Sequence, residues 1–386
     1  MRVEIQTATT LVLKIGSSLL LSQTEDDTYG LNVKWLAAMA GDIADARTKG
    51  QKVIVVTSGA LALGCAKLGI QRQDLNVAQS QAASATGQIE LVRGWQAALG
   101  AHGLTAAQVL LTAEDTEQRR RYLNARQTLN ALLDVGAIPI INENDTLATQ
   151  ELRYGDNDRL AARVAAMVSA DCLVLFSDID GLYTANPQDT DTAEFLDVVE
   201  DVTAEIRAMA GPSGSQHGSG GMVTKLQAGE IAQSAGCHMV LASGRAFSPL
   251  TALAQGARST LFRAHANPLT ARKNWIASTL QPAGAAHLDA GAVRALAAGN
   301  SLLPVGIQSL DGNFKRGDCL SIIAPDGQEI ARGLSAYASL EAGLIIGKDS
   351  KAIAALPDVK QYNLERTEMV HRDDMVLMTS PNGELK

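Results

Sequence analysis

Five apolar runs of strand length stand out in the hydrophobic pattern of the chain. They are Thr10–Ile15, Val53–Val56, Ala137–Ile141, Cys172–Phe176 and His238–Ala242. Segments with helical periodicity separate these runs, which is typical of strand–helix–strand units. The pattern therefore predicts an α/β fold with a mainly parallel open sheet sandwiched by helices.

The expected helices follow from capping residues and from apolar positions three and four apart. Asn32 is expected to cap a helix whose apolar face contains Leu36, Met39 and Ile43. The other expected helices are Leu75–Gly103, Glu114–Val135, Arg159–Val168 and Leu226–Ala235. Gly136 directly follows the second of these four and suits the left-handed conformation that ends many helices.

Polar and glycine residues follow each of the five predicted strands. They are Lys14, Gly16 and Ser17; Ser58 and Gly59; Asn142–Asp145; Ser177 and Asp178; and Ser243 and Gly244. In open α/β sheets, ligands bind beyond the carboxyl ends of the strands. Ordinary turns use the same residue types, so each motif alone is weak, but five together predict a ligand site at one edge. Lys14 is costly inside an apolar strand unless its ammonium group meets an anion.

The segment Ile141–Val164 carries the densest polar cluster of this edge. Asn142–Asp145 is followed by a polar loop and then by Gly155–Asp158, where the next predicted helix begins. An Asx-rich loop with an Asp or Asn cap is the purely structural interpretation. We favour a functional one, because the other strands also end in polar residues.

The segment Gly211–Lys225 is the most glycine-rich of the chain and runs into a predicted helix. A flexible surface loop is the usual interpretation of such a stretch. However, glycines before a helix can turn several backbone N–H groups toward a phosphate, and Lys225 stands near the helix start. The pattern of a P-loop NTPase, GxxxxGK[ST], is absent, which excludes that class.

The pattern of apolar and polar residues changes after about residue 265. Apolar runs at Leu303–Ile307 and Leu320–Ile323 alternate with turn sequences containing Gly312, Gly317 and Gly327, which predicts a small, separate β-rich domain. The expected division is a first domain over 1–265, a connector over 266–282, the β-rich domain over 283–361 and a tail over 362–386.

Charge argues against nucleic acid as a partner. The formal net charge is −8, and the segment Asp311–Lys348 contains four Lys or Arg against five Asp or Glu. The run Arg119–Arg121 is interpreted as a solvated helix face or part of a subunit contact.

The cysteines and the apolar runs bear on location. Four cysteines stand far apart without a CxxC pair, so we expect reduced, mostly buried thiols in a cytoplasmic protein. The N-terminus lacks the apolar core of a signal peptide, and no run reaches the ~18 residues of a membrane span.

Together these motifs closely resemble the glutamate 5-kinases, a family of the amino acid kinase superfamily, over nearly the whole chain. The motifs are Lys14–Ser18, Thr57–Ala60, Asn142–Asp145, Gly155–Asp158, Ser177–Tyr183 and Gly220–Lys225. The segment after the connector is similar to a PUA domain, most clearly at Asn313–Asp318. Ser219 stands where the family commonly has Thr, which keeps a hydroxyl.

The resemblance implies phosphorylation of the γ-carboxylate of L-glutamate by ATP, the first step of proline biosynthesis, with proline as feedback inhibitor. A carboxylate has a reference pKa of about 4.3 and is ionised at pH 7, so it needs no general base. Catalysis then rests on positioning and charge neutralisation. By resemblance, Lys14 and Lys225 are catalytic cations, and Asp158 holds both. Mg²⁺ is expected as the ATP complex, since the sequence names no protein ligand for it.

The resemblance also implies binding roles. Glutamate-binding positions are Ser58, Asp145 and Asn157, with Asp145 suited to the α-ammonium. Gly16 and Gly59 let backbone N–H groups approach the phosphates. The ATP-binding positions are Lys14, Gly16, Ser177, Asp178, Ser219, Gly220, Gly221, Met222, Val223, Thr224 and Lys225. A homo-oligomer, dimer or tetramer, and γ-glutamyl phosphate reductase as a partner are further expectations.

Two alternatives remain open from the residues. One is another amino acid kinase, acting on N-acetylglutamate or aspartate; Asp145 discriminates, because an acetylated nitrogen needs no carboxylate. The other is an RNA-binding or regulatory protein on a retired kinase fold, against which the retained lysines and Asp158 argue.

Overall fold

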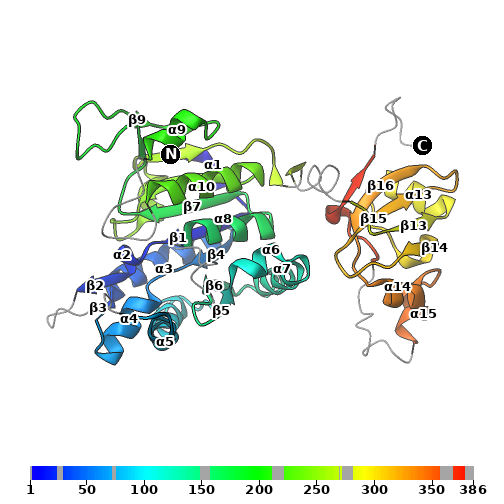
Figure 1. The fold of residues 1–386 in the computed structure, drawn as a ribbon, viewed down its shortest axis with the longest axis horizontal. Coiled ribbons are helices and arrows are strands. Elements are labelled where there is room, and N and C mark those ends of the chain that lie inside the picture. The colour runs from blue at the N-terminus through cyan, green and yellow to red at the C-terminus, as the bar shows by residue number, and fades with distance from the viewer. Residues whose placement is uncertain are drawn as a thin grey trace. The chain divides into compact units, whose positions relative to one another are not determined.

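The computed structural model divides the chain into two units, Met1–Pro268 and Leu269–Lys386 (Figure 1). It describes residues 2–23, 29–71, 75–147, 157–210, 221–268, 270–271, 281–356 and 368–378. Within these ranges, no helix is both long enough and apolar enough to cross a membrane.

An eight-stranded sheet formed by the described residues is the centre of the first unit, with the order β10-β12-β11-β7-β1-β4-β6-β5. All neighbouring strands are parallel except β11 and β12, which are antiparallel. The strands are β1 (Thr10–Ile15), β4 (Lys52–Val56), β5 (Ala106–Leu111), β6 (Ile138–Glu143), β7 (Cys172–Ser177), β10 (Val198–Val199), β11 (His238–Ser243) and β12 (Ser259–Phe262). The five predicted strands and the mainly parallel sheet are confirmed.

Three strands of this sheet are not predicted from the sequence. β5 is the edge strand and most of it is only partly buried, so it lacks the continuous apolar run of a central strand. β10 has two residues, and β12 has four and pairs antiparallel with β11 after the intervening segment 244–258. These strands are placed by their pairing partners, and short runs of this kind carry little signal of their own.

Helices cover both faces of the sheet (Figure 1). The helices are α1 (Val3–Thr7), α2 (Ser17–Leu20), α3 (Val33–Thr48), α4 (Ala60–Leu68), α5 (Val77–Gly100), α6 (Ala113–Glu117), α7 (Arg119–Asp134), α8 (Asn157–Val168), α9 (Ala204–Met209), α10 (Met222–Ser234) and α11 (Pro249–Ala254). One buried cluster joins Leu11 and Leu13 to α3 and α5, and another joins Val12 to α7, α8 and α10. Because strand side chains alternate between faces, Lys14 shares the face of Val12 and points toward α8 and α10.

The helix boundaries differ from the expected ones in two places. The segment Glu114–Val135 forms two helices, α6 and α7, which meet at Gln118 in an extended conformation. The long helix α5 begins at Val77 after an Asn76–Gln79 capping box. The predicted caps are confirmed: Asn32 accepts a hydrogen bond from the backbone of Trp35, and Gly136 has a φ of +81°.

The described residues of the first unit also form two short hairpins. β2 (Leu21–Gln23) pairs with β3 (Tyr29–Leu31), and β8 (Leu182–Tyr183) pairs with β9 (Phe195–Leu196). The β8–β9 hairpin is held by an edge-to-face contact between Tyr183 and Phe195, with ring centroids 5.4 Å apart.

The described residues of the second unit form a five-stranded sheet in the order β14-β13-β15-β16-β17. Its elements are β13 (Gly284–Leu288), α13 (Ala290–Ala297), η3 (Pro304–Gly306), β14 (Ile307–Gly312), β15 (Cys319–Ile323), β16 (Glu329–Leu334), α14 (Ser339–Ile345), α15 (Ser350–Ala354), η4 (Arg372–Asp374) and β17 (Met375–Leu377). The prediction of a β-rich second domain is confirmed. Gly312, Gly317 and Gly327 have φ values of +83° to +87°, as their turns require.

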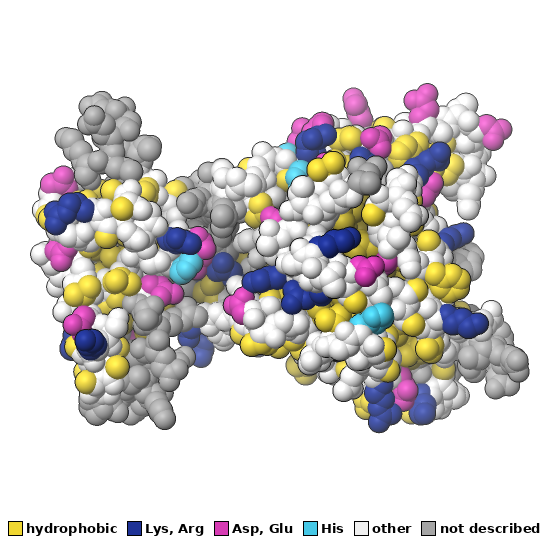
Figure 2. Space-filling model, turned by 180° about the vertical axis from the view of Figure 1, so that it is seen from behind, with side chains coloured by type: hydrophobic (Ala, Val, Ile, Leu, Met, Phe, Trp, Pro, Cys, Tyr) yellow, Lys and Arg dark blue, Asp and Glu magenta, His cyan; other side chains and the backbone are white. Residues whose placement is uncertain are grey.

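Two details of the second unit correct the sequence interpretation. The expected β-like run Leu303–Ile307 contains the 3₁₀ turn η3, because Pro304 cannot donate to a strand ladder. The segment 362–386 is interpreted as a tail, yet β17 lies in it and pairs with β16. On the face of the unit visible in Figure 2, acidic and basic side chains are interspersed.

Candidate active site

A buried cluster of two lysines and one aspartate lies on the α8–α10 side of the sheet. Nζ of Lys14 is 2.6 Å from Oδ1 of Asp158, and Nζ of Lys225 is 3.1 Å from Oδ2. Asp158 is fully buried, and the two lysines are 5% and 7% exposed. Three segments far apart in the sequence therefore meet here: the end of β1, the first turn of α8 and the first turn of α10.

The charges of this cluster do not cancel. Two ammonium groups share one carboxylate, so these three side chains together carry a formal charge of +1 in a site almost without solvent contact. Positive charge in a buried site is costly to desolvate, and a bound anion offsets that cost. The backbone N–H groups at the start of α10 add to the attraction for an anion. The site is therefore built to receive a negatively charged group.

Asn157 connects this cluster to the end of β4. Its carboxamide nitrogen donates to the carbonyl oxygen of Thr57, to Oγ of Ser58 at 3.0 Å and to Oδ1 of Asn142 at 2.7 Å. The structure thus brings Asn157 and Ser58, two of the predicted substrate-binding residues, into direct contact. The sequence places Asn142 in the polar segment Asn142–Asp145 but indicates no separate role for it, whereas in the structure it accepts a hydrogen bond from Asn157.

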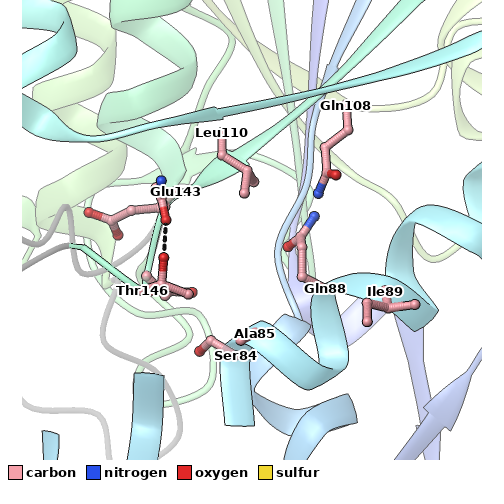
Figure 3. A pocket seen from close by; sticks show the side chains of 10 residues that line it. Ser84, Ala85, Gln88, Ile89, Gln108, Leu110, Glu143 and Thr146 are labelled. Atoms are coloured by element: carbon pink, nitrogen blue, oxygen red, sulfur yellow. Dashed lines mark hydrogen bonds between the residues drawn. The ribbon is translucent and has the colours of Figure 1, made fainter. Parts of the chain in front are cut away.

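The third predicted substrate-binding residue, Asp145, lines a cavity of about 280 Å³ between α5 and the ends of β5 and β6 (Figure 3). Gln88 lines the same cavity and accepts a hydrogen bond of 2.7 Å from the carboxamide of Asn142. Gln88 was missed by the sequence analysis, because an isolated glutamine on a helix carries no motif signal.

Two glycines at the strand ends have different roles: Gly16 leaves space beside the Lys14 ammonium group, and Gly59 adopts a left-handed backbone conformation. Gly16 donates its N–H to the carbonyl of Phe176, and a Cβ on it would lie 3.9 Å from Nζ of Lys14. A side chain there would narrow the approach to the ammonium group. Gly59 has a φ of +102° at the N-terminus of α4, a conformation that L side chains rarely adopt.

Ser177 and Asp178 lie at the end of β7, beside β1. Oγ of Ser177 donates to Oδ1 of Asp178 at 3.0 Å, and the carbonyl of Ser177 accepts a hydrogen bond from Gly244. Both therefore stand at the edge that carries Lys14. The structure places the predicted nucleotide residues Ser177 and Asp178 next to the cluster's own strand.

Of the remaining predicted ATP-binding residues, those that the structure describes lie at the start of α10. Gly221 precedes the helix, and Met222, Val223 and Thr224 form its first turn with Lys225. Oγ1 of Thr224 donates to Oδ2 of Asp158 at 3.1 Å, so this turn is tied to the cluster twice. Ser219 and Gly220 lie outside the described residues, as do Gly155, Asp156 and most of the loop Thr146–Tyr154.

Comparison with known proteins agrees with this arrangement. Residues 9–243 match the amino acid kinase family model, and residues 284–356 match that of the PUA domain. A protein of Agrobacterium fabrum named "Glutamate 5-kinase" is 54% identical over 367 residues, which are 95% of this chain and 92% of that protein. One of Rhodopseudomonas palustris with the same name is 53% identical over 371 residues, 96% of this chain and 97% of that protein. A Rhizobium meliloti protein named "Glutamate 5-kinase 1" is 54% identical and covers 97% of this chain and 93% of its own length. The chain therefore belongs to the amino acid kinase family and, within it, to the glutamate 5-kinases.

Proposed function

We propose that this protein transfers the γ-phosphoryl group of ATP to the γ-carboxylate of L-glutamate, the first step of proline biosynthesis. A carboxylate oxygen attacks the γ-phosphorus, the bond to the β-phosphate oxygen breaks, and γ-glutamyl phosphate and ADP result. The observation that carries the proposal is the buried Lys14–Asp158–Lys225 cluster with its net positive charge. The names of the relatives, at over 50% identity across nearly the whole chain, supply the substrate.

In this proposal the two lysines act directly on the transferred group. Their ammonium groups approach from β1 and from α10 and neutralise charge on the equatorial oxygens of the phosphoryl group in the transition state. Asp158 is a positioning residue, because its two oxygens fix the separation of the ammonium groups before substrates bind. The acceptor is already ionised at neutral pH, so the reaction needs no general base.

Ser58 and Asn157 are proposed to hold glutamate with its γ-carboxylate toward the cluster, while Asp145 takes the α-ammonium. Gly16, Ser177, Asp178 and the segment Ser219–Lys225 are proposed to bind ATP. Mg²⁺ is proposed to arrive coordinated to the phosphates of ATP. Within the described ranges, no group of three or more His, Cys, Asp or Glu side chains is arranged to hold a metal ion.

A coupled assay of ATP consumption with glutamate, N-acetylglutamate and aspartate tests the proposal. We expect turnover with glutamate and, at equal concentration, none above background with the other two. Turnover with N-acetylglutamate in preference to glutamate would contradict the assignment of Asp145 to a free ammonium group.

We also propose that proline inhibits by competing with glutamate. Proline shares the α-carboxylate and α-ammonium, so the residues around Asp145 can hold it, but it has no γ-carboxylate to phosphorylate. Substitutions at Asp145 are expected to change proline sensitivity and the KM for glutamate in unequal ratios. The measurement is a glutamate titration at several fixed proline concentrations, and inhibition that saturating glutamate does not relieve would refute an overlapping site.

A cytoplasmic location is proposed as well. It is supported by the four cysteines, which are all buried and reduced, as suits a reducing compartment. A homo-oligomeric state and an association with γ-glutamyl phosphate reductase stay proposals from family resemblance; mass measurement in solution tests the first and co-purification the second.

A further inference from the structure

The cavity beside Asp145 has walls of opposite chemical character (Figure 3). Ser84 and Gln88 face it from successive turns of α5, and Gln88 extends toward Gln108 of β5. Glu143 and Asp145 line it from the end of β6 and the turn that follows. Hydrogen-bond donors thus stand on the helix side, and carboxylates stand on the other.

The orientation of the Gln88 carboxamide follows from two backbone groups. The N–H of Glu143 can only donate, and it donates to Oδ1 of Asn142 at 2.9 Å. The carbonyl of Thr57 can only accept, and it accepts from the carboxamide nitrogen of Asn157, which also donates to Oδ1 of Asn142. Oδ1 of Asn142 is therefore the acceptor, and its Nδ2 must donate to Oε1 of Gln88. As a result, the Nε2 group of Gln88 is left for the cavity.

Both donors of the helix wall are without a partner in the described part of the chain. Nε2 of Gln88 and Oγ of Ser84 are buried and make no hydrogen bond there, and Ser84 as a whole is only 3% exposed. Buried polar atoms are normally satisfied, and each exception calls for a physical explanation. A bound ligand that accepts a hydrogen bond from each of these two groups would explain why they lack a partner.

We infer that Ser84 and Gln88 bind the α-carboxylate of the amino acid substrate and so determine its specificity. The inference rests on the proposed function. The head group of an amino acid needs hydrogen-bond donors for its carboxylate and an ionised carboxylate for its ammonium group. This cavity offers Gln88 and Ser84 on one side and Asp145 on the other. The chain of carboxamides runs from Gln88 through Asn142 to Asn157, the neighbour of Asp158. The two ends of glutamate are therefore recognised by one hydrogen-bonded network.

The test replaces the donor of Gln88 with an acceptor of the same shape, Gln88→Glu. Three ligands are compared in the full-length protein: glutamate, 4-aminobutyrate, which lacks the α-carboxylate, and L-isoglutamine, whose α-carboxylate is an amide. Their dissociation constants are measured by calorimetry, and KM and kcat are measured for glutamate. We expect weaker glutamate binding and a rise in its KM of about 10–100-fold, because a hydrogen bond to a charged group becomes a repulsion. Binding of 4-aminobutyrate is expected to stay unchanged, and that of L-isoglutamine, which can donate, to strengthen.

The matched control is Gln96→Glu, the same change at an exposed position of the same helix, which should leave all constants unchanged. Ser84→Ala is the second variant and should also weaken glutamate selectively. An equal loss for glutamate and 4-aminobutyrate would show a structural role, and an unchanged affinity for glutamate would show that the carboxylate binds elsewhere; either overturns the inference. Failure of the unmodified protein to phosphorylate glutamate would instead overturn the proposed function.

Discussion

Replacing Asp158 with Asn removes one charge from the cluster and keeps the size of the side chain. In the unmodified protein, the two carboxylate oxygens lie 2.6 Å and 3.1 Å from two ammonium groups, with no solvent contact at Asp158. In Asp158→Asn the lysines lose their shared anion and repel each other in a buried site. Both folding stability and catalysis are expected to fall.

The burial of the cluster sets the size of the effect. Breaking a buried ion pair costs about 3–5 kcal/mol, because the remaining charge is left unpaired. For a domain of this size, each kcal/mol shifts the Tm by about 2–4 °C, so the expected decrease is roughly 6–20 °C. Loss of lysine positioning is expected to lower kcat by about 10²–10³-fold, as for the removal of one transition-state contact.

The control is Asp134→Asn, which makes the same chemical change in an ion pair of similar length at the surface. Nζ of Lys52 lies 2.7 Å from Asp134, and the two side chains are 39% and 67% exposed. Such pairs contribute about 0–1 kcal/mol. Thermal unfolding and steady-state kinetics are measured for both variants, and for Asp158→Asn combined with Lys14→Met. Removal of one lysine should recover part of the lost stability, because the repulsion between the two ammonium groups disappears.

A central role of the Asp158 carboxylate is refuted if Asp158→Asn is no more destabilising than Asp134→Asn, or if its kcat stays within a factor of a few of the unmodified protein. No recovery in the double variant would show that charge repulsion between the lysines is not the cause of the instability.

Three further outcomes are expected. Gly64→Ala should destabilise the protein by at least about 1–3 kcal/mol in denaturant unfolding, because the added Cβ would lie 1.7 Å from the carbonyl oxygen of Ala83, where α4 meets α5. The control Gly100→Ala, with open space around it, should be neutral or stabilising by up to about 1 kcal/mol. Equal effects of the two substitutions would contradict the packing argument. Burial lowers the pKa of His238 from its ordinary value of 6.5, so the unfolded chain binds the proton more readily than the folded protein. The contribution of His238 to the free energy of unfolding is therefore fully present above about pH 6.5 and is lost as the pH falls below that value. Unfolding experiments across this range should show a shallower pH dependence for His238→Gln, and an unchanged slope would exclude this histidine. A chain ending at Pro268 should fold and phosphorylate glutamate, because Lys14, Asp158 and Lys225 all lie in the first unit. An insoluble or inactive product would show that the second unit is required.

The central strands and the chemistry at their ends were accessible from the sequence. Strands buried on both faces read as continuous apolar runs, and β1, β4, β6, β7 and β11 all have this form. Lys14 stood out because a charge in such a run needs a physical reason, and its partner Asp158 stood at a predicted helix start. The caps Asn32 and Gly136 were accessible too, because capping depends on residues close in the chain.

The tertiary structure alone decided what depends on pairing and on contacts between distant segments. The edge strand β5 and the short β10 and β12 owe their form to neighbouring strands rather than to their own composition. The separation of α6 from α7 at Gln118 has no Gly or Pro to announce it. The network of Gln88, Asn142 and Asn157 joins α5, β6 and α8, whose residues are 15 and 54 positions apart along the chain. A single polar side chain on a helix is compatible with many roles, and only the fold shows which atoms it meets and which of its hydrogen bonds is left for a ligand.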